Sequence, residues 1–345
     1  MAVYWFIYSI STFILFISDK FDKVSKMSLF FVYFLFIAFI IGFRYEIGGD
    51  WFAYLRHYEE TIHVDFLSAL KMGDPAYMGL NWLSSHLNLG IIGVNVVCGV
   101  VVASALIYFV MNQPMPWLGL IVATPYYLII VSMGYSRQSV AISFVMLAYT
   151  QWNKEPWKYI VLVLLGALFH KTAIFAIIFA PMILNGSLRV KLSTILLMFP
   201  LMYFIFLADN IDAMVHGYAG GGNANMKSEG GAMRVAMNLI PSIIFLILYK
   251  TFMQFKDYKL WFYISIANII SMIFVSTYST AVDRIALYLL PIQIAFYARV
   301  PMLIENSILR TLFVFAIIII YGLMMFVWFN YSVKAEFWLP YRFEF

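Results

Sequence analysis

Charged residues and cysteine are scarce in this chain. Only 11% of its 345 residues are charged, while 64% are hydrophobic and the mean hydropathy is +0.88. That balance excludes a soluble globular domain. The single cysteine, Cys98, excludes a disulfide within the chain, and its position inside an apolar run predicts a packing role.

Several motifs of soluble enzymes are also missing from the sequence. It has no glycine-rich P-loop, no HExxH, no GxSxG elbow and no DxD pair for divalent metals. We therefore expect no nucleotide chemistry, no metal site and no cofactor. The net charge of +5 is spread over many short links instead of one face, which argues against a nucleic-acid partner.

Long apolar runs separated by short polar links fill the chain. Because a backbone in lipid must satisfy its own hydrogen bonds, they predict an all-α, polytopic integral membrane protein with about 12 transmembrane helices. Residues 1–345 would then form a single transmembrane domain. The expected spans are 2–18, 27–43, 91–111, 116–133, 136–152, 157–169, 172–185, 191–208, 234–254, 259–277, 284–300 and 308–330. Because 157–169 and 172–185 are short, they could form a broken or re-entrant pair with His170 at its apex.

The distribution of basic residues predicts the orientation. The side that holds the link after the first helix collects twelve of the 22 basic residues but five of the 17 acidic ones, in short links. The positive-inside rule places this side in the cytoplasm and both termini outside. Two outer stretches are long: 44–90, expected to be partly interfacial or re-entrant, and the glycine-rich 209–233, expected to be a mobile loop that closes over a bound glycan.

Polar residues gather at the outer ends of two apolar segments within Gly134–Thr172. Arg137 and Gln138 open the first segment, and His170 and Lys171 close the second. Ionisable groups at membrane depth are costly and usually face a bundle interior or a watery cavity. This stretch is therefore the leading candidate for a functional site.

Basic residues recur where helices are expected to run inward from the outer face. They lie in or beside the first turns, and they are Arg137, Lys171, Arg234 and Arg284. Together with the free N–H groups of helix N-termini they would bind an anion, most naturally phosphate or diphosphate. The alternative for each is contact with lipid headgroups. Arg44 ends the second helix, where a cation suits the helix dipole, so a structural role is favoured for it.

An aromatic run follows the expected tight turn Gly48-Gly49-Asp50. It contains Trp51 and Tyr54, whose rings would suit the apolar faces of sugars. The alternative is an aromatic belt at the membrane interface.

Three residues are candidates for a general base. His170 is a candidate because histidine is the commonest general base in enzymes and because it stands beside Lys171, although a lone histidine among apolar residues is more often structural. Asp283 matches a capping box with Thr280, which would explain it without catalysis. Asp50 is the third, and its Gly-Gly-Asp context also fits simple turn chemistry.

Four stretches carry a family resemblance. FRYEIGGDWFAY, GYSRQSVAISF, LLGALFHKTAIF and DRIALY resemble, in order and spacing, the EpsG family of bacterial exopolysaccharide proteins, which are similar to Wzy-type polymerases. The resemblance implies a glycosyltransferase of GT-C-like polymerase or ligase architecture in the bacterial inner membrane, with its site facing the periplasm. It would transfer an undecaprenyl-diphosphate-linked glycan onto another lipid-linked repeat unit, to build capsule, exopolysaccharide or O-antigen without a metal.

The positions that match the family are Arg44, Asp50, Arg137, Gln138, His170, Lys171 and Arg284. A chain-length regulator and a flippase are further partners that the resemblance implies. The roles that we expect are catalysis for His170, Asp50 and Asp283, diphosphate binding for Arg137, Lys171, Arg284, Arg44 and Arg234, and glycan binding for Gln138, Trp51, Tyr54 and Tyr288.

Three other functions stay open. A flippase for lipid-linked sugars would need repeats and midplane polar groups. A membrane O-acyltransferase acting on the polysaccharide would also use an intramembrane histidine, but it would need a cytoplasmic entry for its acyl donor. A structural subunit of an export complex would tolerate changes at His170 and Arg137.

Overall fold

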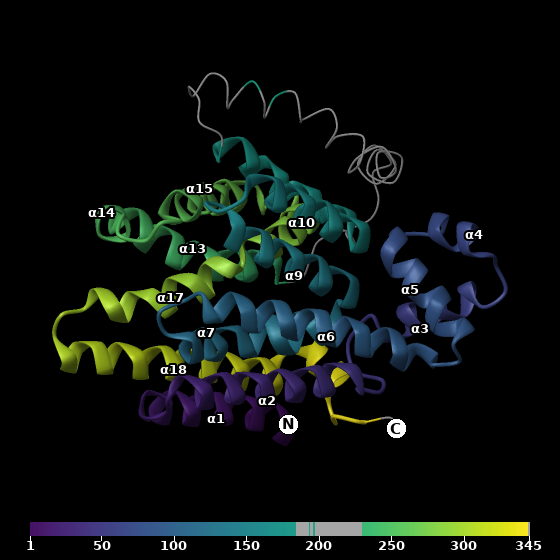
Figure 1. Ribbon diagram of the computed structural model, residues 1–345, viewed down its shortest axis with the longest axis horizontal. Coiled ribbons are helices and arrows are strands. Elements are labelled where there is room, and N and C mark those ends of the chain that lie inside the picture. Colours follow the sequence, from purple (N-terminus) through teal and green to yellow (C-terminus); the bar gives the residue numbers. More distant parts are fainter. Residues whose placement is uncertain (184–192, 194–195, 197–229, 344–345) are drawn as a thin grey trace. The chain divides into compact units, whose positions relative to one another are not determined.

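The computed structural model describes residues 1–183, 193, 196 and 230–343 (Figure 1). Within these ranges the chain is helical, and the only extended pairing is an isolated bridge between Arg44 and Phe343. The all-α prediction is therefore confirmed. The helices up to His170 are α1 (Ala2–Ile17), η1 (Ser18–Lys20), α2 (Lys23–Gly42), α3 (Trp51–Thr61), α4 (Phe66–Lys71), α5 (Pro75–His86), α6 (Gly90–Met111), α7 (Pro116–Ala123), η2 (Thr124–Val131), α8 (Ser132–Gly134), α9 (Ser136–Gln151) and α10 (Pro156–Phe169). After His170 come η3 (Lys171–Met182), α13 (Gly231–Ile247), α14 (Tyr249–Phe252), α15 (Tyr258–Phe274), α16 (Ser279–Leu289), α17 (Pro291–Leu303), α18 (Ser307–Tyr331) and η5 (Val333–Trp338).

A helix stands at every predicted span except 191–208, which falls outside the described residues apart from 193 and 196. Four of them are long and apolar enough to cross a membrane: Lys23–Gly42, Gly90–Met111, Pro116–Gly134 and Ser307–Tyr331. A fifth span results if α16 and α17, bent by 41° at their junction, count as one. A multi-pass membrane protein is thus supported, while twelve crossings and the orientation stay predictions.

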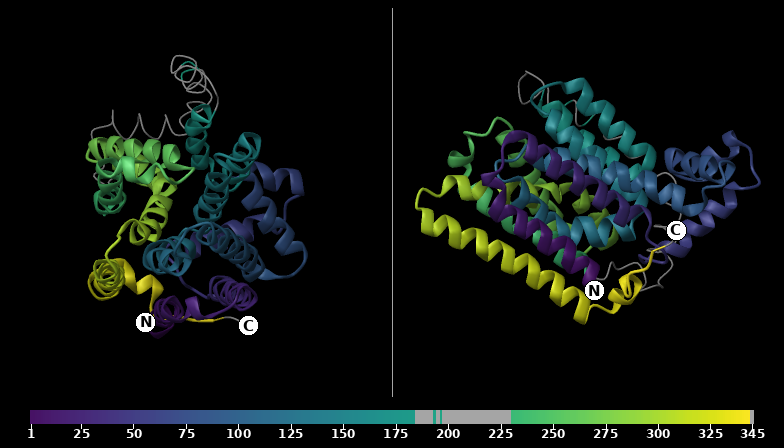
Figure 2. Two further views of the ribbon diagram at one scale, coloured as in Figure 1. Left: turned by 60° about the vertical axis from the view of Figure 1, so that its left-hand side comes forward. Right: turned by 60° about the horizontal axis from the view of Figure 1, so that its bottom comes forward.

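Two compact units make up the chain. The first contains Met1–Ser143, Leu168–His170 and Ile294–Phe345, and the second contains Phe144–Ala167 and Lys171–Gln293. In the first unit, α2 and α6 lie side by side (Figures 1 and 2). Glycines allow this close approach, since a Cβ on Gly99 would lie 2.9 Å from the Ala38 carbonyl oxygen and one on Gly42 equally close to Val96.

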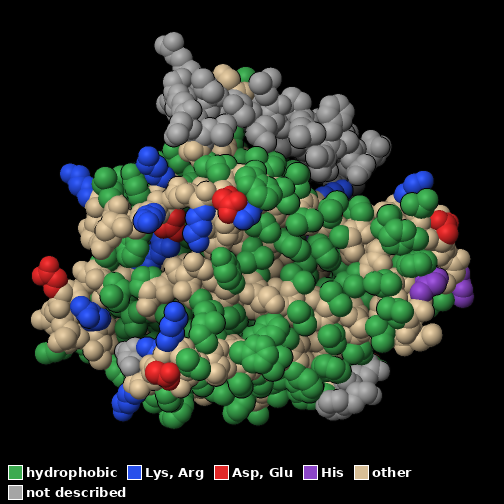
Figure 3. All heavy atoms as spheres, in the orientation of Figure 1, with side chains coloured by type: hydrophobic (Ala, Val, Ile, Leu, Met, Phe, Trp, Pro, Cys, Tyr) green, Lys and Arg blue, Asp and Glu red, His purple; other side chains and the backbone are tan. Residues whose placement is uncertain are grey.

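The outer faces of the first unit's helices are apolar. Phe13 on α1, Val32 on α2 and Leu312 on α18 are all more than half exposed. Figure 3 shows hydrophobic side chains predominating over α1 and α2. Apolar side chains turned outward on long helices are typical of contact with lipid.

The second unit is held together by buried polar side chains. Asn238 on α13 donates to the Ala286 carbonyl of α16 at 2.8 Å and accepts from Gln293 at 2.7 Å. Asn268 on α15 donates to Ser242 at 3.0 Å. Such side-chain bonds between helices add to packing where apolar contact alone does not distinguish protein from lipid.

The outer stretch 44–90 contains three short helices. They are α3, α4 and α5, and none of them is long enough to cross a bilayer. The start of the predicted loop 209–233 lies outside the described residues, and its last residues, from Gly231, already belong to α13.

The turn before α3 is fixed by Gly48. The Trp51 amide donates to the Gly48 carbonyl at 3.1 Å, which confirms the tight turn, and the Gly48 amide donates to the Phe337 carbonyl of η5 at 2.8 Å. Gly48 adopts φ +106°, in the region that favours glycine. A hydrogen bond to η5 therefore fixes the start of the stretch 44–90.

Gly48→Ala is expected to lower stability by at least about 2 kcal/mol, because strained backbone and a steric clash act together. A Cβ at this position would lie 2.2 Å from the Met133 carbonyl oxygen, whereas one at Gly49 would meet nothing within 4 Å. Gly49→Ala is thus the matched control. The midpoint of thermal unfolding in detergent checks the difference, and equal midpoints for the two variants would contradict it.

Candidate functional site

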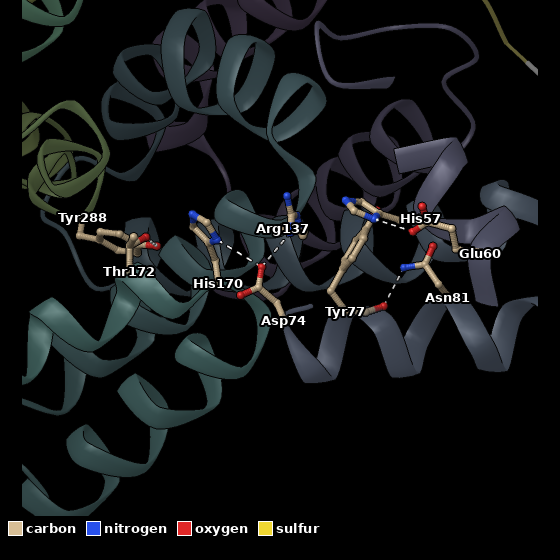
Figure 4. Close-up of polar contacts among 9 residues, drawn as sticks. All are labelled: His57, Glu60, Asp74, Tyr77, Asn81, Arg137, His170, Thr172 and Tyr288. Atoms are coloured by element: carbon tan, nitrogen blue, oxygen red, sulfur yellow. Dashed lines mark hydrogen bonds and ion pairs between the residues drawn. The ribbon is translucent and has the colours of Figure 1, made fainter. Parts of the chain in front are cut away.

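Asp74 is the centre of a cluster of ionisable residues in the first unit. Arg137 donates from Nη1 to Asp74 Oδ2 at 3.0 Å, and His170 Nδ1 lies 3.4 Å from the same oxygen (Figure 4). The side chains of Asp74, His170 and Arg137 are 9%, 14% and 28% exposed, respectively. Two residues that the sequence singled out are therefore brought together by a third that it did not.

Local structure explains why the Asp74 carboxylate is available. Asp74 is the N-cap residue of α5, and Pro75 fills the first helical position, where its fixed φ suits a helix start. An N-cap aspartate normally accepts from the first amides of its own helix, yet Asp74 makes no such side-chain bond. Its carboxylate is directed to Arg137 and His170 instead.

His170 stands at the apex of a helical hairpin. It follows α10 and precedes η3, and the Tyr159 hydroxyl of α10 donates to the Ala176 carbonyl of η3 at 2.6 Å. Residues 17 positions apart meet in this way only if the chain reverses between them. The two segments therefore form a hairpin with His170 at its apex, and its predicted course as a broken or re-entrant pair in the membrane stays a prediction.

Arg137 lies against a pair of neighbouring aromatic rings. Its guanidinium carbon lies 5.7 Å from the centre of the Tyr54 ring and 5.9 Å from that of Tyr77. Both rings are buried, and cation–π attraction favours a fixed guanidinium at such a distance. Burial raises the pKa of Tyr54, and the charge of Asp50 adds to this, so the phenol stays neutral at physiological pH.

The other aromatic candidate in this stretch is also enclosed. Trp51 is buried and makes an edge contact with Tyr45, at 5.7 Å between ring centres. The structure thus assigns packing contacts to Trp51 and Tyr54, and their predicted contact with sugar rings stays untested. Asp50 is the N-cap residue of α3 and makes no side-chain cap bond.

Arg44 has structural partners. It is buried, and it donates to the Met133 carbonyl at 3.2 Å, to the Ser136 hydroxyl at 2.6 Å and to the Ile41 carbonyl. These bonds connect the end of α2 to the residue that begins α9, directly before Arg137. They favour the structural interpretation of Arg44 and show how it positions Arg137.

Arg234 and Asp283 pair with each other in the second unit. Arg234 donates from Nε to Asp283 Oδ1 and from Nη2 to Oδ2, both at 2.6 Å. The expected capping box is wrong, because α16 begins at Ser279 with Tyr278 at the N-cap and without a side-chain cap bond. The earlier start also places Arg284 in the second turn of α16, so its predicted first-turn position was wrong as well.

The remaining candidates occupy different places. Lys171 begins η3, as predicted, and Gln138 is buried near the start of α9. Tyr288 shares a hydrogen bond of 2.8 Å with the Thr172 hydroxyl. Of the predicted site residues, the Asp74 cluster contains Arg137 and His170, and the diphosphate-binding roles of Arg44, Lys171 and Arg284 stay predictions.

The Arg234–Asp283 pair gives a test of the Asp283 base hypothesis. Asp283→Asn should lower stability by about 1–3 kcal/mol, because it leaves a partly buried guanidinium without its charged partner. The double variant Arg234→Gln/Asp283→Asn should recover part of that loss. Thermal unfolding of the three proteins measures this, and an Asp283→Asn protein with an unchanged midpoint but little transfer would identify Asp283 as a base instead.

The Asp74 cluster is suited to proton transfer next to bound negative charge. Nδ1 of His170 faces a carboxylate, so a neutral imidazole with its proton on Nδ1 would donate to Asp74 and leave Nε2 to accept another proton. Arg137 supplies a permanent positive charge with several planar donors. Among the described residues, no group of three or more His, Cys, Asp or Glu side chains is placed to hold a metal ion.

Sequence reasoning missed Asp74 because its local signal has a simpler explanation. Asp followed by Pro at the start of a helix is a common N-terminal pattern. Nothing in the sequence indicates that the carboxylate leaves its own helix.

Comparison with known proteins gives one family. The EpsG family model matches residues 27–343. No curated protein and no solved structure matches the chain significantly.

Proposed function

Because this chain belongs to the EpsG family of membrane proteins, which is linked to exopolysaccharide synthesis, we propose that it is a polysaccharide polymerase of Wzy type. Its substrates would be two lipid-linked repeat units, and its activity that of a glycosyltransferase. The donor glycan leaves undecaprenyl diphosphate and joins the terminal sugar of the acceptor. The reaction takes place at the periplasmic face of the bacterial inner membrane.

The proposal rests mainly on one observation: Arg137 and His170 both contact the same oxygen, Asp74 Oδ2. In the proposed reaction His170 Nε2 takes the proton of an acceptor hydroxyl while that oxygen attacks the anomeric carbon of the donor. The bond from this carbon to the diphosphate oxygen breaks, and the diphosphate leaves with the electron pair. Arg137 stabilises the negative charge that develops on it.

This route needs no nucleotide sugar, because the diphosphate lipid is itself the leaving group. A single displacement inverts the anomeric configuration. The proton on His170 returns to the solvent or to the departing diphosphate, so the enzyme ends the cycle unchanged. Lys171 and Arg284 are further candidates for diphosphate contacts, and Gln138 and Tyr288 for the glycan.

A transfer assay tests the proposal. Purified protein in nanodiscs is incubated with lipid-linked repeat units, without nucleotide sugars and with or without EDTA. Longer glycans on the lipid are the expected product in both conditions. Movement of the lipid across the bilayer without a new glycosidic bond would point to a flippase, and acyl transfer to the polymer would point to an acyltransferase.

A further inference from the structure

Asp74 Oδ2 is shared by two groups with different tasks in the proposed reaction. Arg137 donates to it at 3.0 Å, and His170 approaches it at 3.4 Å. A carboxylate oxygen that already accepts from an arginine is a weaker partner for a second donor, because the first bond draws on the same negative charge. In this arrangement Arg137 and His170 therefore compete for Asp74.

Arg137 is the member of the cluster that a ligand meets first. Its side chain is 28% exposed, about three times the exposed fraction of Asp74 at 9%. The neighbouring rings of Tyr54 and Tyr77, whose centres are 5.5 Å apart, both contact the guanidinium from one side. The guanidinium would thus keep its position if its carboxylate partner were exchanged for another anion.

We propose that Asp74 is a resident counter-ion that diphosphate replaces on Arg137, and that this exchange makes Asp74 a stronger positioning residue for His170. The inference rests on the proposed function and adds a regulatory step to it. Before the donor binds, Asp74 neutralises Arg137. When diphosphate is bound to Arg137, the Asp74 oxygen accepts a hydrogen bond from the Nδ1–H of His170. It thereby stabilises the imidazolium that forms when Nε2 takes a proton. Donor binding thereby activates the base.

The exchange predicts opposite effects on binding and on catalysis when the carboxylate is removed. Asp74→Asn takes away the anion that competes with diphosphate, so affinity for inorganic diphosphate should rise about threefold to tenfold, the range expected for losing one partly exposed ion pair. The same change removes the partner of His170, so single-turnover transfer at saturating donor should fall about a hundredfold or more.

Two further variants distinguish the proposed exchange on Arg137 from a purely structural role of Asp74. Asp74→Glu keeps a carboxylate, and it should return diphosphate affinity toward the wild-type value and recover part of the transfer. Asp65→Asn is the matched control, since Asp65 is an exposed N-cap residue on the same outer stretch that accepts from Ser68, and it should change neither quantity. A purely structural Asp74 would give weaker binding, slower transfer and a lower unfolding midpoint together.

The experiment uses the full chain in nanodiscs, with calorimetric titration of inorganic diphosphate and single-turnover transfer. If Asp74→Asn does not fold, Asp74→Ser replaces it as the neutral variant. A folded neutral variant with unchanged or weaker diphosphate affinity overturns the exchange, even where the wild type polymerises. If the wild type transfers nothing but the neutral variant binds diphosphate more tightly, the exchange stands and the polymerase proposal fails.

Discussion

His170→Ala is expected to lower single-turnover transfer by about two to four orders of magnitude, the usual contribution of a positioned proton acceptor. Diphosphate binding should persist, because Arg137 keeps its contacts with the neighbouring rings of Tyr54 and Tyr77. The loss would therefore appear in the turnover rate more than in donor affinity.

His63→Ala provides the control for His170. His63 is an exposed histidine in the turn between α3 and α4, outside the Asp74 cluster, and its replacement should leave transfer unchanged. Transfer by both variants is followed with the same lipid-linked substrates, together with the unfolding midpoint. A folded His170→Ala protein with near-normal turnover would remove the histidine from the mechanism and leave Asp50 and Asp283 as bases to test.

Arg137→Lys should lower transfer by about two to three orders of magnitude although the positive charge remains. Lysine lacks the planar fork that contacts two diphosphate oxygens at once, and its ammonium does not stack on aromatic rings as a guanidinium does. Affinity for lipid diphosphate should also weaken, because the same donors serve the bound donor substrate.

Arg56→Lys is the control for Arg137, because Arg56 is exposed on α3. Titration with lipid diphosphate and single-turnover transfer are measured for both variants. If Arg137→Lys keeps wild-type affinity and turnover, the arginine acts only as a general charge and the leaving-group role assigned to it is wrong.

Helix positions could largely be predicted because they depend on local composition. Apolar runs of spanning length have few stable conformations in lipid other than a helix. This is why α2, α6 and α18 appear close to their expected ranges. Helix starts were less certain, as α16 shows, because Ser279 begins it five residues before the predicted span, and the expected cap is not used.

Residue roles were harder to predict because they depend on partners far away in the sequence. Asp283 matched a local capping pattern, but a charged partner 49 residues away, Arg234, takes both of its oxygens. Arg44 was expected to bind diphosphate, with a structural role as the alternative, and its bonds to Met133 and Ser136, which favour that alternative, depend on how the helices pack.

The sequence by itself determined the membrane class, the all-helical fold and the family, and it pointed to Arg137 and His170 as candidates, because composition and short motifs carry this information. Only the tertiary structure decided what joins these two residues. Asp74 lies 63 residues before Arg137 and 96 before His170, at the start of a different helix. Which partner a carboxylate binds depends on the distances and the burial that the folded chain produces. Neither quantity can be derived from the order of the residues alone.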